Sequence, residues 1–195
     1  MVDATGFIVA GGKSSRMGRD KAWLEIGGEP MIQRIVRAFL PVTTHLAIIA
    51  NSPEYAELGL PVYADTHIGI GPIEAIRTAL SNCRTEYSLL AACDMPFITS
   101  DLLSFLIVRQ SGYDAVVPMD AEGKIEPLCA AYSIRALHAV TELIGAGQRK
   151  PSLIYELVKT RFVPFSEFAD LPGSNMFFRN VNTESDYLEA LAVAV

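Results

Sequence analysis

The sequence contains no long hydrophobic run. Its apolar stretches, such as 89–93 and 102–108, end or are interrupted by polar residues long before the roughly 18 residues needed to span a bilayer. Residues 1–6 include no basic residue, so the usual pattern of a signal peptide is missing as well. We therefore expect a cytoplasmic protein with no membrane partner.

Cysteine is scarce and shows no pairing pattern. The three cysteines, Cys83, Cys93 and Cys129, form no Cys-x-x-Cys motif and no cysteine–histidine spacing, so neither a disulfide framework nor a zinc site is indicated. We interpret all three as small buried hydrophobic residues. A thiolate nucleophile at Cys93 would need a nearby histidine, and the three histidines form no recognisable dyad in the sequence.

Positive charge is also in deficit. The chain has 16 Lys and Arg against 22 Asp and Glu, a formal net charge of −6, whereas nucleic-acid binding depends on basic residues that neutralise phosphates. We expect no nucleic-acid partner, although a local basic cluster could bind a small polyanion. A length of 195 residues, with 50% hydrophobic and 19% charged residues, excludes a disordered or fibrous chain and suits one domain.

Short β-rich apolar runs alternate with helical patterns along the chain. Strands are predicted at 5–10, 46–51, 61–64, 87–93, 114–118, 128–132 and 161–165. Helices are predicted at 30–39, 72–80, 100–108, 133–144, 152–158 and 183–193. This order predicts an α/β protein: a single domain over 1–195 with a mainly parallel, doubly wound sheet and right-handed crossovers.

Polar residues follow four successive predicted strands. The first strand leads into Ala10 and Gly11, the second ends in Asn51, the third in Asp65, and the fourth in Asp94. Ligands of open α/β sheets bind beyond the carboxyl ends of the strands, so these residues are expected to converge on one edge. Each alone is equally typical of a turn, and only their joint placement indicates a site.

The segment 11–21 is the densest signal in the chain. It holds four of the 16 basic residues, Lys13, Arg16, Arg19 and Lys21, next to glycines that follow a buried strand. Backbone N–H groups of such a loop can wrap phosphate oxygens while the cations neutralise their charge. We predict a phosphate site here, and the alternative is an exposed loop with solvated charges.

Two common nucleotide motifs are missing. A Walker A loop ending in Gly12-Lys13-Ser14 would require glycine at position 7, where the chain has Phe7, and no G-x-G-x-x-G fingerprint supports a nicotinamide dehydrogenase. Asp94, after a buried run, offers the hard carboxylate oxygen that Mg²⁺ prefers. The alternative for Asp94 is a turn residue before Pro96.

Residues 9–21, Val-Ala-Gly-Gly-Lys-Ser-Ser-Arg-Met-Gly-Arg-Asp-Lys, resemble the signature loop of nucleotidyltransferases with a glycosyltransferase-A-like fold. The Ala-Gly-Gly form of the loop is similar to the molybdenum cofactor guanylyltransferase family. Segments 71–72, 92–97, 126–132 and 178–183 agree with it, so the resemblance covers essentially the whole chain. It implies a Rossmann-like three-layer α/β/α fold.

The resemblance also implies a reaction. That family transfers GMP from Mg-GTP to the phosphate of molybdenum-molybdopterin, releasing pyrophosphate and forming the guanine dinucleotide cofactor. It implies Mg²⁺ as cofactor, GTP and molybdopterin as small-molecule partners, and transient contact with other proteins of molybdenum cofactor biosynthesis or with acceptor proteins. The nucleotide-binding half would span about 1–100 and the acceptor half about 101–195.

The resemblance to the family also implies roles for specific residues. Val9, Ala10 and Gly11 would hold GTP, and Lys21 and Arg16 would contact its phosphates. These two cations, with Asp94, are the candidate catalytic residues.

The remaining matched positions surround the same nucleotide. Asn51 and Asp65 would hold the base and ribose, and Asp94 would bind Mg²⁺ and the nucleotide. Asn180 and Asn182 match an Asn-x-Asn stretch on the acceptor side.

The chain departs from the family pattern after Gly71-Pro72. Ala75 stands where the family often has glycine, and Glu74 adds a negative charge near the nucleotide. Residue chemistry leaves the base open, because Asn and Asp side chains can read several ring edges. Alternatives are a transferase that joins CTP to molybdopterin or acts on a sugar phosphate, and a nucleotide-binding module without catalysis.

Overall fold

The computed structural model describes residues 3–11 and 20–193. In these residues seven strands form the central sheet, in the order β5-β4-β1-β6-β8-β7-β9. Their bounds are β1 (Ala4–Val9), β4 (His45–Ile49), β5 (Val62–Tyr63), β6 (Tyr87–Ala92), β7 (Ala115–Pro118), β8 (Cys129–Ser133) and β9 (Thr160–Val163). All of them run parallel except β8, which is antiparallel to both of its neighbours.

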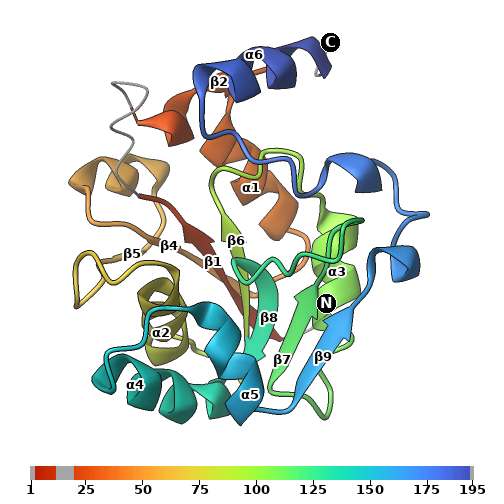
Figure 1. The fold of residues 1–195 in the computed structure, drawn as a ribbon. Coiled ribbons are helices and arrows are strands. Elements are labelled where there is room, and N and C mark those ends of the chain that lie inside the picture. Colours follow the sequence, from red (N-terminus) through yellow and green to blue (C-terminus); the bar gives the residue numbers. More distant parts are fainter. Residues whose placement is uncertain (1–2, 12–19, 194–195) are drawn as a thin grey trace.

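Helices cover both faces of this sheet (Figure 1). Their bounds are α1 (Met31–Phe39), α2 (Pro72–Ser81), α3 (Ser100–Ile107), α4 (Leu137–Gly145), α5 (Ile154–Leu157) and α6 (Glu184–Val193). Helices α1 and α3 pack on one face, and α2, α4 and α5 pack on the other. The prediction of a single-domain, three-layer α/β fold with a mostly parallel sheet is confirmed.

Short elements connect these layers. The 3₁₀ helices are η1 (Lys21–Trp23), η2 (Pro53–Leu58), η3 (Ile134–Ala136), η4 (Pro151–Leu153), η5 (Phe165–Glu167) and η6 (Ser174–Met176). Strands β2 (Glu25–Ile26) and β3 (Glu29–Pro30) form a small hairpin that the sequence patterns did not predict, because two-residue strands show no periodicity. The direction of β8 follows from its connection, since a helix-free loop joins it to β7 and parallel neighbours need a longer crossover.

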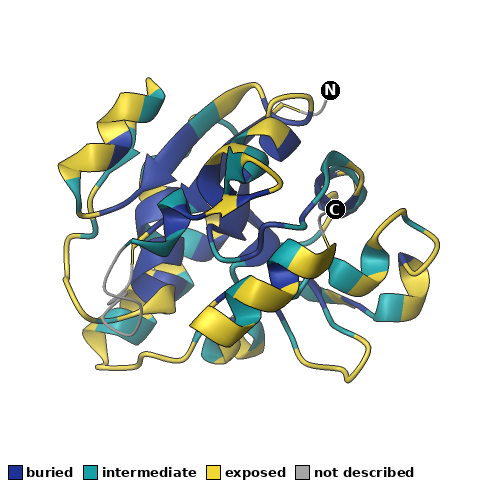
Figure 2. Cartoon of the chain, turned by 90° about the horizontal axis from the view of Figure 1, so that it is seen from above, coloured by how far each residue is buried: buried dark blue, intermediate teal, exposed yellow. Residues whose placement is uncertain are grey.

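The core is split by the central sheet. Phe7 and Ile8 are both fully buried on β1, but Phe7 packs against the α2 side and Ile8 against the α1 side, as alternating side chains of a strand must. Figure 2 shows the buried strands at the centre and exposed residues on the outer surfaces of the helices. Among the described residues, no helix has both the length and the apolar character needed to cross a bilayer.

The backbone of β1 at Gly6 is closely covered by the core. A Cβ atom added there would lie 2.5 Å from Phe39 Cδ1 and 2.9 Å from Leu46 Cδ1. We expect Gly6→Ala to lower the free energy of unfolding by about 1–3 kcal/mol, because an overpacked core must shift side chains off their preferred rotamers. Gly145→Ala in α4 is the control, since nothing lies within 4 Å of its added Cβ. Urea unfolding of both variants checks this, and equal stabilities would contradict it.

Candidate functional site

The carboxyl ends of the parallel strands point to the upper part of Figure 1, where α6 also lies. The backbone ladder continues just past β1: Ala10 N donates to Ile49 O and Cys93 N donates to Val9 O, both at 2.9 Å. The chain therefore leaves β1, β4 and β6 side by side at one edge. Gly11 takes a φ of 108° there, a conformation that glycine adopts without strain.

A lysine, an aspartate and an asparagine from distant parts of the chain meet at this edge. Lys21 Nζ lies 2.7 Å from Asp94 Oδ2 and 2.8 Å from Asn182 Oδ1. The side chains of Lys21 and Asp94 are each 19% exposed, so both remain reachable from solvent. Val181 N donates to Asp94 O at 2.8 Å, which fixes the 180–182 segment beside β6. The predicted phosphate ligand, metal ligand and acceptor residue thus share one cluster.

A buried tyrosine stabilises the backbone next to Lys21 through Asp20. Asp20 Oδ1 accepts a hydrogen bond from Ala22 N at 3.0 Å, and its Oδ2 accepts one from the Tyr55 hydroxyl at 2.7 Å. Tyr55 is fully buried and stacks on Trp23, with ring centroids 5.8 Å apart. Burial raises the pKa of the Tyr55 hydroxyl, and its bond to Asp20 adds to this effect. Sequence reasoning missed Tyr55, which belongs to no motif.

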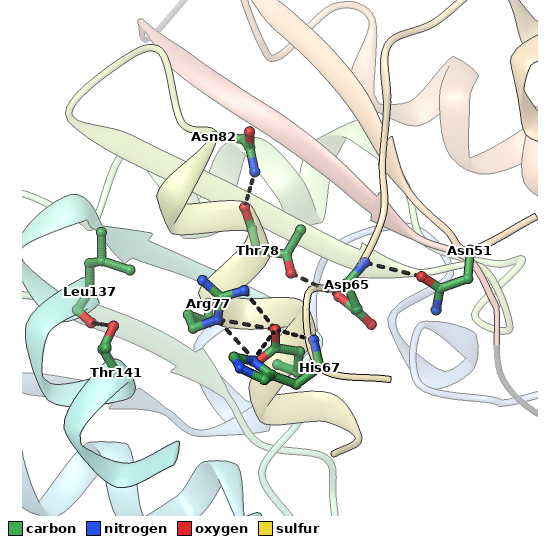
Figure 3. A network of polar contacts seen from close by, with 9 residues as sticks. Asn51, Asp65, His67, Arg77, Thr78, Asn82, Leu137 and Thr141 are labelled. Atoms are coloured by element: carbon green, nitrogen blue, oxygen red, sulfur yellow. Dashed lines mark hydrogen bonds and ion pairs between the residues drawn. The ribbon is translucent and has the colours of Figure 1, made fainter. Parts of the chain in front are cut away.

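Asn51 and Asp65 are adjacent, as predicted from the strand ends (Figure 3). Asp65 N donates to Asn51 Oδ1 at 3.1 Å, and Thr78 Oγ1 donates to Asp65 Oδ1 at 2.8 Å. Burial raises the pKa of the Asp65 carboxyl, while the bond from Thr78 acts against the shift. Sequence reasoning missed Thr78, which lies on the predicted helix 72–80 but belongs to no motif.

Glu74 does not present a free charge to this edge. Its side chain has no exposed surface, and it forms an ion pair with Arg77 through Nη2 at 2.6 Å. Burial raises the pKa of the Glu74 carboxyl, but hydrogen bonds from Arg77 and His67 outweigh burial and lower it overall. The added negative charge is therefore compensated inside the protein.

A second buried carboxylate lies near Asp94. Glu126 is 5% exposed and pairs with Lys124 Nζ at 2.8 Å. Burial raises the pKa of the Glu126 carboxyl, Lys124 lowers it, and the negative charge of Asp94 adds to the increase. The sequence resemblance includes the segment 126–132, but it does not predict the ion pair between Glu126 and Lys124.

The oxygen atoms of this cluster suit a hard cation. Asp94 and Asn182 already point oxygens at the ammonium of Lys21, and the Oδ1 atom of Asn180 is buried with no hydrogen-bond partner among the described residues. Within those residues no group of three or more His, Cys, Asp or Glu side chains could hold a metal. One carboxylate with amide oxygens fits Mg²⁺, which keeps several waters and binds substrate phosphates.

Arg16 lies outside the described residues, as do the other basic residues between 12 and 19. Cys93 and Cys129 are buried as expected, whereas Cys83 is only partly buried. Burial raises the pKa of the Cys93 thiol to about 12. A thiol with such a pKa is almost entirely protonated at neutral pH, which argues against a cysteine nucleophile.

Comparison with known proteins gives a consistent result. The model of the MobA-like NTP transferase domain family matches residues 6–160. A probable molybdenum cofactor guanylyltransferase of Pelotomaculum thermopropionicum is 37% identical over all of this chain and 95% of that protein. One from Carboxydothermus hydrogenoformans is 36% identical over 99% of this chain and 98% of that protein. The crystal structure of molybdopterin-guanine dinucleotide biosynthesis protein A from Archaeoglobus fulgidus is similar, with a TM-score of 0.81, 25% identity and 97% coverage of both chains.

Proposed function

The chain belongs to the family of MobA-like NTP transferase domains and is a nucleotidyltransferase, and from this premise we propose that it transfers GMP from GTP to the phosphate of molybdenum-molybdopterin. Pyrophosphate is the second product. Mg²⁺ is the proposed cofactor, and 1–100 and 101–195 are the proposed nucleotide and acceptor halves. The protein is proposed to work in the cytoplasm, in transient contact with other proteins that make or receive the cofactor.

The observation that carries this proposal is the cluster of Lys21, Asp94 and Asn182. It joins a cation, a carboxylate and an amide at the carboxyl edge of the sheet, with both distances to Lys21 Nζ at or below 2.8 Å. Asn51 and Asp65 lie at the ends of β4 and β5 on the same edge. A triphosphate needs positive charge next to a hard oxygen ligand, and its base and ribose need polar groups farther along.

The proposed reaction is an in-line displacement without a covalent protein intermediate. An oxygen of the molybdopterin phosphate attacks the α-phosphorus of GTP, and the bond from this phosphorus to the β-phosphate oxygen breaks. Lys21 and Arg16 bind the phosphates and oppose the charge that grows on the leaving pyrophosphate. Asp94 would hold Mg²⁺, which would supply further positive charge to the phosphates, and Asn180 and Asn182 would lie on the acceptor side. The chain's part is thus to position two anions that repel each other.

Pyrophosphate release from each of the four nucleoside triphosphates tests the proposal. We expect release with GTP and Mg²⁺ only when molybdenum-molybdopterin is added, because the acceptor phosphate is the nucleophile. Release with CTP alone would contradict the guanylyl assignment and favour the cytidylyl alternative. Release with none of the four, in the presence of molybdopterin or of sugar phosphates, would favour a binding module without catalysis.

A further inference from the structure

We propose that Glu74 is a positioning residue that sets nucleotide selectivity, because it holds the segment 65–71 in one arrangement beside the nucleotide site. This inference rests on the proposed function for the identity of the nucleotide. It concerns a residue that departs from the family pattern and that touches none of the candidate phosphate ligands.

The first support is the number of contacts that converge on this one carboxylate. Arg77 Nε lies 3.1 Å from Oε1 and 3.0 Å from Oε2, and Arg77 Nη2 lies 2.6 Å from Oε1. His67 adds its backbone N–H at 3.1 Å and its ring Nδ1 at 3.2 Å. Burying a carboxylate is costly unless it is fully paired. The two bonds from His67 therefore link the segment that precedes helix α2 to a carboxylate on that helix.

The second support is where that segment is attached. Glu74, Arg77 and Thr78 are spaced i, i+3 and i+4, so they share one face of α2. Thr78 binds the side chain of Asp65, whose backbone in turn binds Asn51. The same helix face therefore fixes both the segment and the pair proposed to hold the base and ribose, as Figure 3 shows for its labelled members.

The third support is the conformational freedom of residues 68–71 in the middle and at the end of this segment. Ile68 is 81% exposed, and Gly69 and Gly71 take φ values of 87° and 98°. Residues 68 and 69 form a turn, and no backbone hydrogen bond joins 68–70 to another described segment. Glycines and a backbone without bonds to other segments leave such a stretch with many accessible conformations, and restricting them costs free energy on binding. Because Glu74 fixes His67 at the start of this stretch and helix α2 begins directly after Gly71, fewer arrangements of its N–H and C=O groups remain, and this restriction favours telling one ring edge of a base from another.

The test compares Glu74→Gln with Asp114→Asn. Asp114 is a matched control because it also binds an arginine, Arg135 Nε at 2.8 Å, and a backbone N–H, that of Lys159 at 3.1 Å, but precedes β7 at the opposite edge of the sheet. For Glu74→Gln we expect KM for GTP to rise at least about fivefold with kcat within about twofold, and the preference for GTP over ATP to fall in proportion. Asp114→Asn is expected to leave both quantities unchanged.

Hydrogen exchange of the 66–71 amides without nucleotide is the second readout. It should accelerate in Glu74→Gln and stay unchanged in Asp114→Asn. Faster exchange with unchanged KM and selectivity would show a merely structural ion pair and overturn the inference, as would unchanged exchange. If Glu74→Gln does not fold, His67→Ala decides, because its side chain is 54% exposed and its loss should raise KM less but in the same direction. Unchanged KM in that variant would then overturn the inference.

Failure of the proposed function gives a different result. In that case the unmodified protein releases pyrophosphate with no combination of substrates. Calorimetric titration of GTP and ATP without acceptor then still measures selectivity. A loss of GTP preference in Glu74→Gln but not in Asp114→Asn would support the inference, and equal preference in all three proteins would reject it.

Discussion

An Asp94→Asn variant is expected to lose about 10²- to 10³-fold in turnover while it keeps its fold. The substitution keeps the size of the side chain but removes the negative charge, and with it the proposed ligand of Mg²⁺ and the partner of Lys21 at 2.7 Å. The backbone bond from Val181 N to the carbonyl oxygen of residue 94 does not depend on the side chain, so the 180–182 segment should stay in place. Steady-state pyrophosphate release measures the loss of turnover, and a thermal unfolding curve checks that the variant keeps its fold.

The magnesium dependence separates two explanations of such a loss. If Asp94 holds the metal, activation of the variant should need a higher Mg²⁺ concentration than activation of the unmodified protein. If Asp94 only orients Lys21, the activation curve should keep its midpoint while its plateau falls. Asp114→Asn at the opposite edge of the sheet controls for the loss of a paired aspartate. Turnover of Asp94→Asn within about threefold of the unmodified protein would reject both roles, because a lost charge at a phosphoryl-transfer site costs far more.

The strand ends could be predicted from the sequence because two simple rules act together there. Buried strands appear as compact apolar runs, and the carboxyl ends of parallel strands meet at one edge. Asn51 and Asp65 were expected to lie together on this basis, and their hydrogen bond at 3.1 Å shows that they do. This prediction needed only the types of residue and their positions in the sequence. It did not need any knowledge of contacts between side chains.

These rules could not predict the contacts between side chains that organise the site. Lys21 and Asn182 are 161 positions apart, and no periodicity connects them. Asp20 and Tyr55 are 35 positions apart and meet only through the fold, and in the sequence Tyr55 has the pattern of an ordinary core residue. Glu74 illustrates a further limit: the sequence shows its charge, but its compensation depends on a partner one helical turn away and on a loop backbone.

Lys21→Met is expected to lower kcat/KM for GTP by about 10²-fold or more, because it removes the described cation of the cluster and keeps the aliphatic stem. Both reactants are anions, so the lysine has to help assemble them and also oppose the charge on the leaving pyrophosphate. Lys159→Met is the control, since Lys159 Nζ lies over the ring of Tyr113 at 5.0 Å and not at the carboxyl edge. Wild-type turnover in Lys21→Met would reject the assignment of the phosphate site.

The double variant Lys21→Met/Asp94→Asn tests whether the two residues act as a unit. Their side chains are in direct contact, and residues in contact seldom have additive effects. If Lys21 acts on the triphosphate directly and Asp94 acts on the same triphosphate through Mg²⁺, the second substitution should cost much less than it does alone, because the charge pair is already broken. Multiplicative losses would instead indicate that the two residues contribute independently of each other. Single-turnover rates at saturating GTP distinguish these cases, because they report the transfer step without product release.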